Sequence, residues 1–149
     1  MKPILRMIGV VLFLTFVACG SGDIGPVGVW KVDPDATLAA NEKQIASQLQ
    51  NLPPSGRAKE RENFQSLFKS LRGTIELRAD KTLYSETQMG ERKQVMSGSW
   101  ELDGDKVRMK SRLEGSELES VTVGSVVSGQ MTVNTVGTEQ FVVLTKQDD

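Results

Sequence analysis

The stretch that most constrains this fold is SGSWELDGDKVRMKSR, residues 97–112. Residues 98–102 alternate small or apolar side chains with polar ones, as a strand does when only one of its faces is covered. Residues 103–105, Asp-Gly-Asp, supply a turn, and residues 106–110 resume the alternation. We therefore predict a β-hairpin with one apolar face, made of Gly98, Trp100, Leu102, Val107 and Met109.

A second strand with a tryptophan opens the folded part of the chain. Residues 28–33, GVWKVD, place Trp30 two residues after a glycine, as in the hairpin. Val27 and Val29 alternate with Trp30, so apolar side chains stand on both faces of this strand. We expect it to be covered on both sides and to form one antiparallel β-core with the hairpin.

Turn signals recur along the second half of the chain. They are Asp80-Lys81, Gly90, Asp103-Gly104, Gly115, Gly124, Gly129 and Gly137. With alternating runs between them, they favour an antiparallel meander over parallel units, which would need a helix between strands. We predict a mainly β fold of seven or eight strands, a number that suits a small barrel or a curled sheet. The last strand, residues 141–144, is apolar on both faces.

A helical pattern interrupts the strands between residues 34 and 72. In its first part, residues 34–50, apolar side chains recur at helical spacings. Asp33 is suited to cap this helix and Pro34 to begin it, because a proline there gives up a donor that the helix end leaves unpaired. The apolar stripe consists of Leu38, Ile45, Leu49 and Leu52.

A second helix is predicted at residues 57–72, after the break at residues 53–56, with Gly73 as its C-terminal cap. Its stripe consists of Phe64, Leu67, Phe68 and Leu71. The two helices form a hairpin inserted after the first strand. Their stripes either close the β-core or form a movable lid or a surface for a partner.

The N-terminal residues have the pattern of an export signal. Lys2 and Arg6 are the only charges before Asp23, and residues 7–18 form an apolar run. A run of that length is too short for a bilayer, which needs about 20 residues. Residues 16–19, Phe-Val-Ala-Cys, resemble the bacterial lipobox. The alternative is an ordinary secretory signal followed by a buried cysteine.

The lipobox resemblance implies three segments: a signal peptide at residues 1–18, a lipidated Cys19 with its linker up to residue 26, and a domain at residues 27–149. Lipid chains on Cys19 would hold the protein to a membrane that it does not span. Gly20 stands where an Asp would resemble the inner-membrane retention signal. The implied location is therefore the cell envelope, at the outer membrane facing the periplasm in a two-membrane bacterium.

Gly28-Val29-Trp30 resembles the Gly-x-Trp signature of lipocalins, and Gly98-Ser99-Trp100 has the same form. The meander at residues 27–146 is similar in pattern to lipocalin-like lipoproteins of bacteria. This resemblance implies a β-barrel. It also implies that the barrel can bind a small apolar or amphiphilic ligand. A helical hairpin stands here where the family has a long first loop.

The composition argues against catalysis. The chain has no histidine, and its one cysteine is Cys19, so neither a Ser-His nor a Cys-His pair can form. Two carboxylate pairs, at residues 33 and 35 and at residues 103 and 105, lie in turn and cap contexts. We expect no enzyme activity, no metal and no cofactor. We also expect no nucleic-acid partner, because no basic cluster is interleaved with aromatic residues.

Two functions remain open. One is a non-catalytic interaction or structural role in the cell envelope, in which the barrel is solid and docks to another envelope protein. The other is binding of a small apolar or amphiphilic ligand at the membrane face. The candidate contact residues for either role are Trp30, Trp100, Phe64 and Phe68.

Overall fold

The computed structural model describes residues 25–148 of the chain as a closed β-barrel with two helices. The strands are β1 (Gly28–Val32), β2 (Arg72–Leu77), β3 (Thr82–Met89), β4 (Arg92–Asp103), β5 (Lys106–Leu113), β6 (Glu119–Val127), β7 (Gln130–Thr135) and β8 (Phe141–Lys146). The helices α1 (Pro34–Gln50) and α2 (Pro54–Ser70) lie between β1 and β2. Each strand is antiparallel to its neighbours, and β1 pairs with β8 to close the barrel. The predicted meander with a helical hairpin after the first strand is confirmed.

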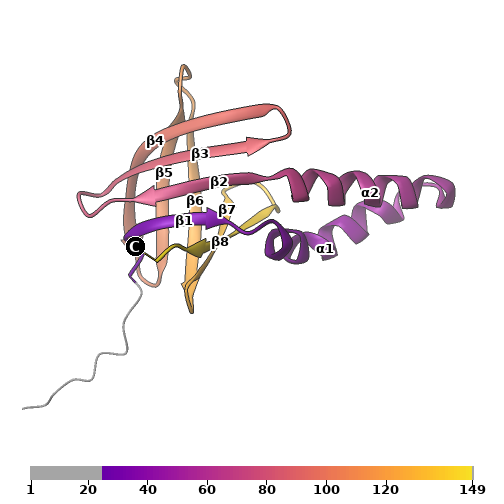
Figure 1. Ribbon diagram of the computed structural model, residues 1–149, viewed down its shortest axis with the longest axis horizontal. Coiled ribbons are helices and arrows are strands. Elements are labelled where there is room, and N and C mark those ends of the chain that lie inside the picture. The colour runs from indigo at the N-terminus through magenta and orange to yellow at the C-terminus, as the bar shows by residue number, and fades with distance from the viewer. Residues whose placement is uncertain (1–24, 149) are drawn as a thin grey trace, which may run out of the picture.

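The two helices form a hairpin that extends from the barrel on the side opposite the C-terminus (Figure 1). Helix α1 packs against β8 and against α2. Neither helix is long and apolar enough to cross a membrane, nor is any other helical stretch within residues 25–148.

Side chains fill the centre of the barrel. The buried cluster consists of Trp30, Val32, Leu71, Leu77, Leu83, Trp100, Val107, Met109, Met131, Val133 and Leu144. Both tryptophans satisfy their indole donors locally: Nε1 of Trp30 donates to the carbonyl of Pro26 at 2.7 Å, and Nε1 of Trp100 donates to that of Arg78 at 2.9 Å. The predicted core built on two tryptophan strands is confirmed.

The outer face of β1 is more exposed than the sequence predicts. We predicted that this strand is covered on both sides, but Val29 is 37% exposed and Val27 is also exposed. The prediction is wrong because α1 packs on β8, which leaves the outer side of β1 in contact with water. β8 is the strand covered on both faces: Leu144 is buried inside the barrel and Val143 is buried on the outer side.

Helix α1 begins as predicted. Pro34 occupies the first turn, and Oδ1 of Asp33 accepts a hydrogen bond from the amide of Ala36 at 2.9 Å. The buried residues of the helix recur every four positions. They are Thr37, Asn41, Ile45 and Leu49, and the predicted apolar stripe includes only the last two.

Helix α2 differs from the prediction at both ends. It begins at Pro54, because proline is tolerated in the first turn, and it ends at Ser70. Gly73 is no helix cap: it lies in β2 opposite Thr87, where an added Cβ would come within 2.5 Å of the carbonyl oxygen of Glu86. No residue of α2 is fully buried, and Leu67 is 43% exposed. The second stripe therefore does not close the core, apart from Leu71 just beyond the helix.

Two other predicted positions are wrong. Gly124 is not in a turn but in the middle of β6, facing the core, where an added Cβ would lie 3.1 to 3.2 Å from Val133 and Met131. A small residue is needed there because larger neighbours already occupy the space. Leu102 belongs to the predicted hairpin but is 54% exposed, because it stands at the end of β4, at the rim of the barrel.

Candidate ligand-binding groove

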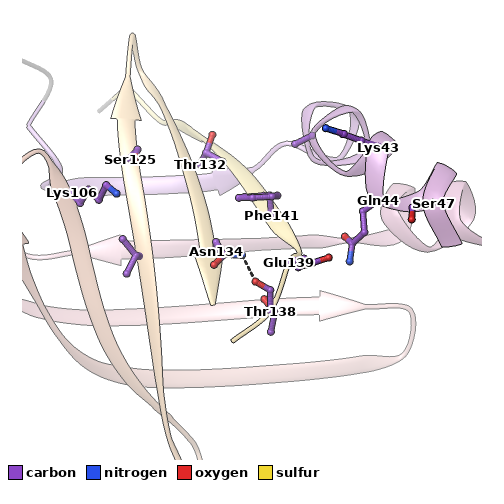
Figure 2. Close-up of a pocket in the computed structure, with 12 residues that line it drawn as sticks. Lys43, Gln44, Ser47, Lys106, Ser125, Thr132, Asn134, Thr138, Glu139 and Phe141 are labelled. Atoms are coloured by element: carbon purple, nitrogen blue, oxygen red, sulfur yellow. Dashed lines mark hydrogen bonds between the residues drawn. The ribbon is translucent and has the colours of Figure 1, made fainter. Parts of the chain in front are cut away.

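A groove of about 900 Å³ lies between α1 and the outer surface of the barrel. We call it the α1 groove. It is lined by Ala40, Lys43, Gln44 and Ser47 of α1, by Lys106, Val123, Ser125, Thr132, Asn134 and Phe141 of the strands, and by Thr138 and Glu139 of the β7–β8 loop. Figure 2 shows these side chains on the helix, on the strands and on the loop that faces the helix.

Strand alternation places this groove outside the barrel. Successive side chains of a strand point to opposite faces of the sheet. Met131 and Val133 of β7 belong to the buried core, so Thr132 and Asn134 point outward. On β6, Gly124 faces the core, and its neighbour Val123 therefore also points outward.

Polar side chains of α1 hold the helix wall of the groove against β8. The hydroxyl of Thr37 accepts a hydrogen bond from the amide of Val143 at 3.0 Å and donates to the carbonyl of the same residue at 3.3 Å. One turn later, the side chain of Asn41 makes the equivalent pair of hydrogen bonds with the backbone of Phe141. Its Nδ2 donates to the carbonyl at 2.8 Å, and its Oδ1 accepts from the amide at 3.0 Å. Because all of these groups are buried or partly buried, leaving them unpaired would be costly.

The spacing of these contacts explains why a helix can take the place of a strand. Residues four apart in a helix are separated by about 6 Å along its axis. Residues two apart in a strand are separated by about 6.6 Å. Thr37 and Asn41 therefore match Val143 and Phe141 in register. The last backbone bond from the end of β1 runs from the amide of Asp33 to the carbonyl of Val143 at 2.8 Å, and helix α1 continues the pairing of β8 from there.

The floor of the groove is apolar at its centre. Phe141 is 39% exposed and lies on β8 beneath α1, with Val123 on β6. Asn134 fixes the neighbouring loop: its Nδ2 donates to the carbonyl of Thr138 at 2.8 Å and to that of Gln140 at 3.0 Å. The first of these bonds is drawn in Figure 2.

Three charged side chains line the groove. Lys43 stands on the helix and Lys106 on β5, with Phe141 between them in Figure 2, and Glu139 lies on the loop. The ion pairs found within residues 25–148 join Arg61 to Glu42, Arg78 to Glu76 and Lys93 to Glu86, so neither lysine of the groove is paired there. The groove thus combines an apolar floor with one carboxylate and two lysines that form no ion pair within residues 25–148.

The sequence-predicted site residues lie elsewhere. Trp30 and Trp100 are buried in the core, and Phe64 and Phe68 are partly buried on α2. None of these four lines the α1 groove. Trp100 also borders a smaller surface depression, where the ammonium of Lys81 lies 3.9 Å from its ring centre. Cys19 and its lipobox lie outside the described residues.

Sequence reasoning missed the groove because its walls come from distant segments and are polar in part. The sequence pattern identifies Phe141 only as a strand residue. The alternating cations that begin at Lys106 are a signal in the sequence, since they mark the outer face of a strand whose other face is apolar.

Among the acidic side chains of residues 25–148, Asp33 serves as a helix cap and Asp80 as a turn residue. Asp33 caps α1, and Oδ1 of Asp80 accepts hydrogen bonds from the hydroxyl and amide of Thr82, which lower the pKa of Asp80. Arg78 lowers the pKa of Glu76 by hydrogen bonding to its carboxylate. Within residues 25–148 no three acidic, cysteine or histidine side chains gather in a way that could hold a metal ion.

Comparisons with known proteins found similar solved structures but no family. No family model matches the chain, and neither does any curated protein. One similar solved structure is a "REP1-NXSQ fatty acid transporter", 11% identical, with a TM-score of 0.39 over 83% of this chain and 96% of that one. Another is secretory abundant heat soluble protein 4 from Ramazzottius varieornatus, 13% identical, with a TM-score of 0.38 over 82% and 94% of the two chains.

Proposed function

We propose that this protein binds a small amphiphilic molecule in the α1 groove, on the outside of its barrel. The observation that carries the proposal is the groove itself: about 900 Å³ of space lined by a part-exposed Phe141 and by two lysines that form no ion pair with the residues that the structure describes. Ligand sites of that size are typical of proteins that bind small molecules. The centre of the barrel is already occupied by side chains, which favours an external site over an internal one.

Some of the lining residues would supply affinity for the ligand, and others would orient it. Phe141, Val123 and Ala40 offer apolar surface that a hydrocarbon or ring can cover, and burial of such surface drives binding. Lys43 and Lys106 stand where a polar or anionic end of the ligand would lie. Binding in this form is non-covalent, and it needs no nucleophile or base, in keeping with a chain that has no histidine.

The proposal includes the cellular setting implied by the lipobox. A lipid on Cys19 would tether the barrel to the envelope membrane, most simply the outer membrane. Residues 20–26 reach about 25 Å when fully extended. The groove would then work close to a membrane surface, where amphiphilic molecules are concentrated.

Titration of the full chain with anilinonaphthalene sulfonate, a fluorescent amphiphile, tests the site. Ala40 lines the groove from an exposed position on α1, so Ala40→Trp should fill the groove without disturbing the fold. We expect a loss of dye affinity of at least about tenfold, which is about 1.4 kcal/mol. Ala39→Trp is the matched control, because Ala39 is exposed on the same helix but does not line the groove. Equal dye binding by both variants and the wild type would place the ligand elsewhere.

A second function, docking to another envelope protein, is favoured by one observation. Helix α2 has no buried residue and leaves Leu67 43% exposed beside the partly buried Phe64 and Phe68. An apolar stripe open to water on a projecting hairpin suits a protein contact. This interaction role does not require the α1 groove, so substitutions in α2 and in the groove separate the two functions.

A further inference from the structure

The helical hairpin is bonded to the barrel near its base only. Within residues 25–148, every hydrogen bond found between α1 and the strands involves Thr37 or Asn41, in the half of the helix nearest β1. The one such bond found there for α2 comes from Arg72, the first residue of β2, to the carbonyl of Lys69 at the end of the helix. The part of the hairpin beyond Asn41 is therefore held by packing.

One face of α1 borders the α1 groove instead of packed side chains. Its residues follow helical spacing, and they are Ala40, Lys43, Gln44 and Ser47. Ile45 and Leu49 are buried, but neither belongs to the core cluster of the barrel. Helix α2 has no fully buried residue and is joined to α1 at the surface by the ion pair of Arg61 with Glu42. The hairpin thus adjoins the barrel core without being part of it.

An element attached in this way opens at a lower cost than the whole fold. The bonds of Thr37 and Asn41 must break before the hairpin can leave β8, and its departure removes the helix wall of the groove. Each helix has 17 residues, a length that is only marginally stable alone in water, so α2 should lose its backbone hydrogen bonds in the open state. A molecule that touches both walls of the groove can bind only while the hairpin is docked.

We propose that a ligand in the α1 groove controls the docking of the helical hairpin on the barrel. This inference rests on the proposed ligand-binding function and adds its regulation. Because the ligand binds the docked state alone, it makes opening rarer by a factor of one plus the ratio of free ligand to its dissociation constant. By the same linkage, a partner that binds α2 in one of the two states changes the affinity of the groove. Occupancy of the groove would thereby reach α2, which does not line it.

Amide hydrogen exchange of the full chain tests the coupling. Without ligand, the amides of α2 should be less protected than those of β4 and β5, because the hairpin opens separately from the barrel. With anilinonaphthalene sulfonate at ten times its dissociation constant, exchange of the α2 amides should slow about tenfold. Contact with the dye cannot cause this change, because no residue of α2 lines the groove. Equal protection of α2 and the strands without dye would overturn the proposal.

The two alanine variants of α1 provide the matched pair. In Ala40→Trp, whose groove is filled, exchange of α2 should not respond to the dye at that concentration. In Ala39→Trp it should respond as in the wild type, because Ala39 does not line the groove. Dye that binds the groove of the wild type and leaves α2 exchange unchanged would overturn the coupling and leave the binding function standing. A wild type that binds no dye in the groove would overturn both.

Thr37→Val supplies a second readout that needs no ligand. It replaces the hydroxyl that pairs with the backbone of Val143 by a methyl group, at a position that does not line the groove. Loss of these bonds should make exchange of the α2 amides at least about fivefold faster. Thr37→Ser keeps the hydroxyl and should exchange like the wild type. Equal α2 exchange in the wild type and Thr37→Val would show that these bonds do not hold the hairpin, and would overturn the proposal.

Discussion

Asn41 on α1 exchanges two hydrogen bonds with the backbone of Phe141, a residue 100 positions later in the chain. Its Nδ2 donates to the carbonyl at 2.8 Å, and its Oδ1 accepts from the amide at 3.0 Å. A neighbouring strand would satisfy the same two groups. The asparagine thus closes the barrel edge where β1 has ended, and it holds the helix that forms one wall of the α1 groove.

Replacing Asn41 by Ala should lower the free energy of unfolding by about 1 to 3 kcal/mol, because it leaves the partly buried amide and carbonyl of Phe141 without their side-chain partner. Urea unfolding of the variant measures this loss. Asn63→Ala is the control, since Asn63 is exposed on α2 and should change stability by less than about 0.5 kcal/mol. A similar small change for Asn41 would mean that water replaces its side chain at the seam.

Trp100→Ala should cost about 3 to 5 kcal/mol of stability, because it leaves a large cavity in the core and removes a bond to the carbonyl of Arg78. Leu102→Ala, two residues along the same strand, should cost under about 1 kcal/mol, because that side chain is exposed at the rim. Thermal or urea unfolding distinguishes them. A loss under about 1 kcal/mol at Trp100 would contradict the core described above.

Phe68→Asp should leave the barrel folded, because α2 has no fully buried residue and the new carboxylate can reach water. We expect a loss of about 1 to 2 kcal/mol from reduced packing on α1. Circular dichroism and urea unfolding measure it. If the variant also loses a cross-linked envelope protein that wild type captures, the interaction role gains support. Complete unfolding would show that the hairpin is integral to the core.

Thr82→Val should raise the pKa of Asp80 toward the usual value for an aspartate. The hydroxyl of Thr82, at 2.6 Å from Oδ1, is the largest cause of the lowered pKa, and its amide is the next. A pKa lower in the folded state stabilises the fold at pH values above the unfolded pKa, and this stabilisation is lost as the pH falls through the folded one. Carboxyl NMR titration of wild type and variant checks the shift. An unchanged pKa would rule out the hydroxyl as its cause.

Cys19→Ser should abolish lipid attachment and leave the folded domain intact, because Cys19 lies outside every predicted strand and helix. Metabolic labelling with a fatty acid should mark the wild type and not the variant. Equal labelling of both would make the anchor assignment wrong. Unfolding curves of the two proteins should coincide.

The sequence by itself determined the elements. Alternation around Trp30 and Trp100, with a turn at Asp103-Gly104, is enough to predict strands and hairpins, because side-chain direction and turn geometry are local properties. Asp33 and Pro34 likewise mark the start of α1 without reference to the rest of the fold. Local signals also mislead where tertiary contacts decide: they predict a helix cap at Gly73 and a turn at Gly124, yet both residues lie in strands and closely approach neighbouring atoms.

Only the tertiary structure decided how the barrel closes and where the groove lies. Thr37 and Asn41 are polar, so the sequence alone places them on the surface of the helix. Their partners are backbone groups of β8, which are the same for any residue type and leave no signal in the sequence. The docking of α1 on β8 also exposes Val29 and covers Val143. Pairing between segments 100 residues apart depends on the closure of the whole sheet, and no local pattern of side chains encodes it.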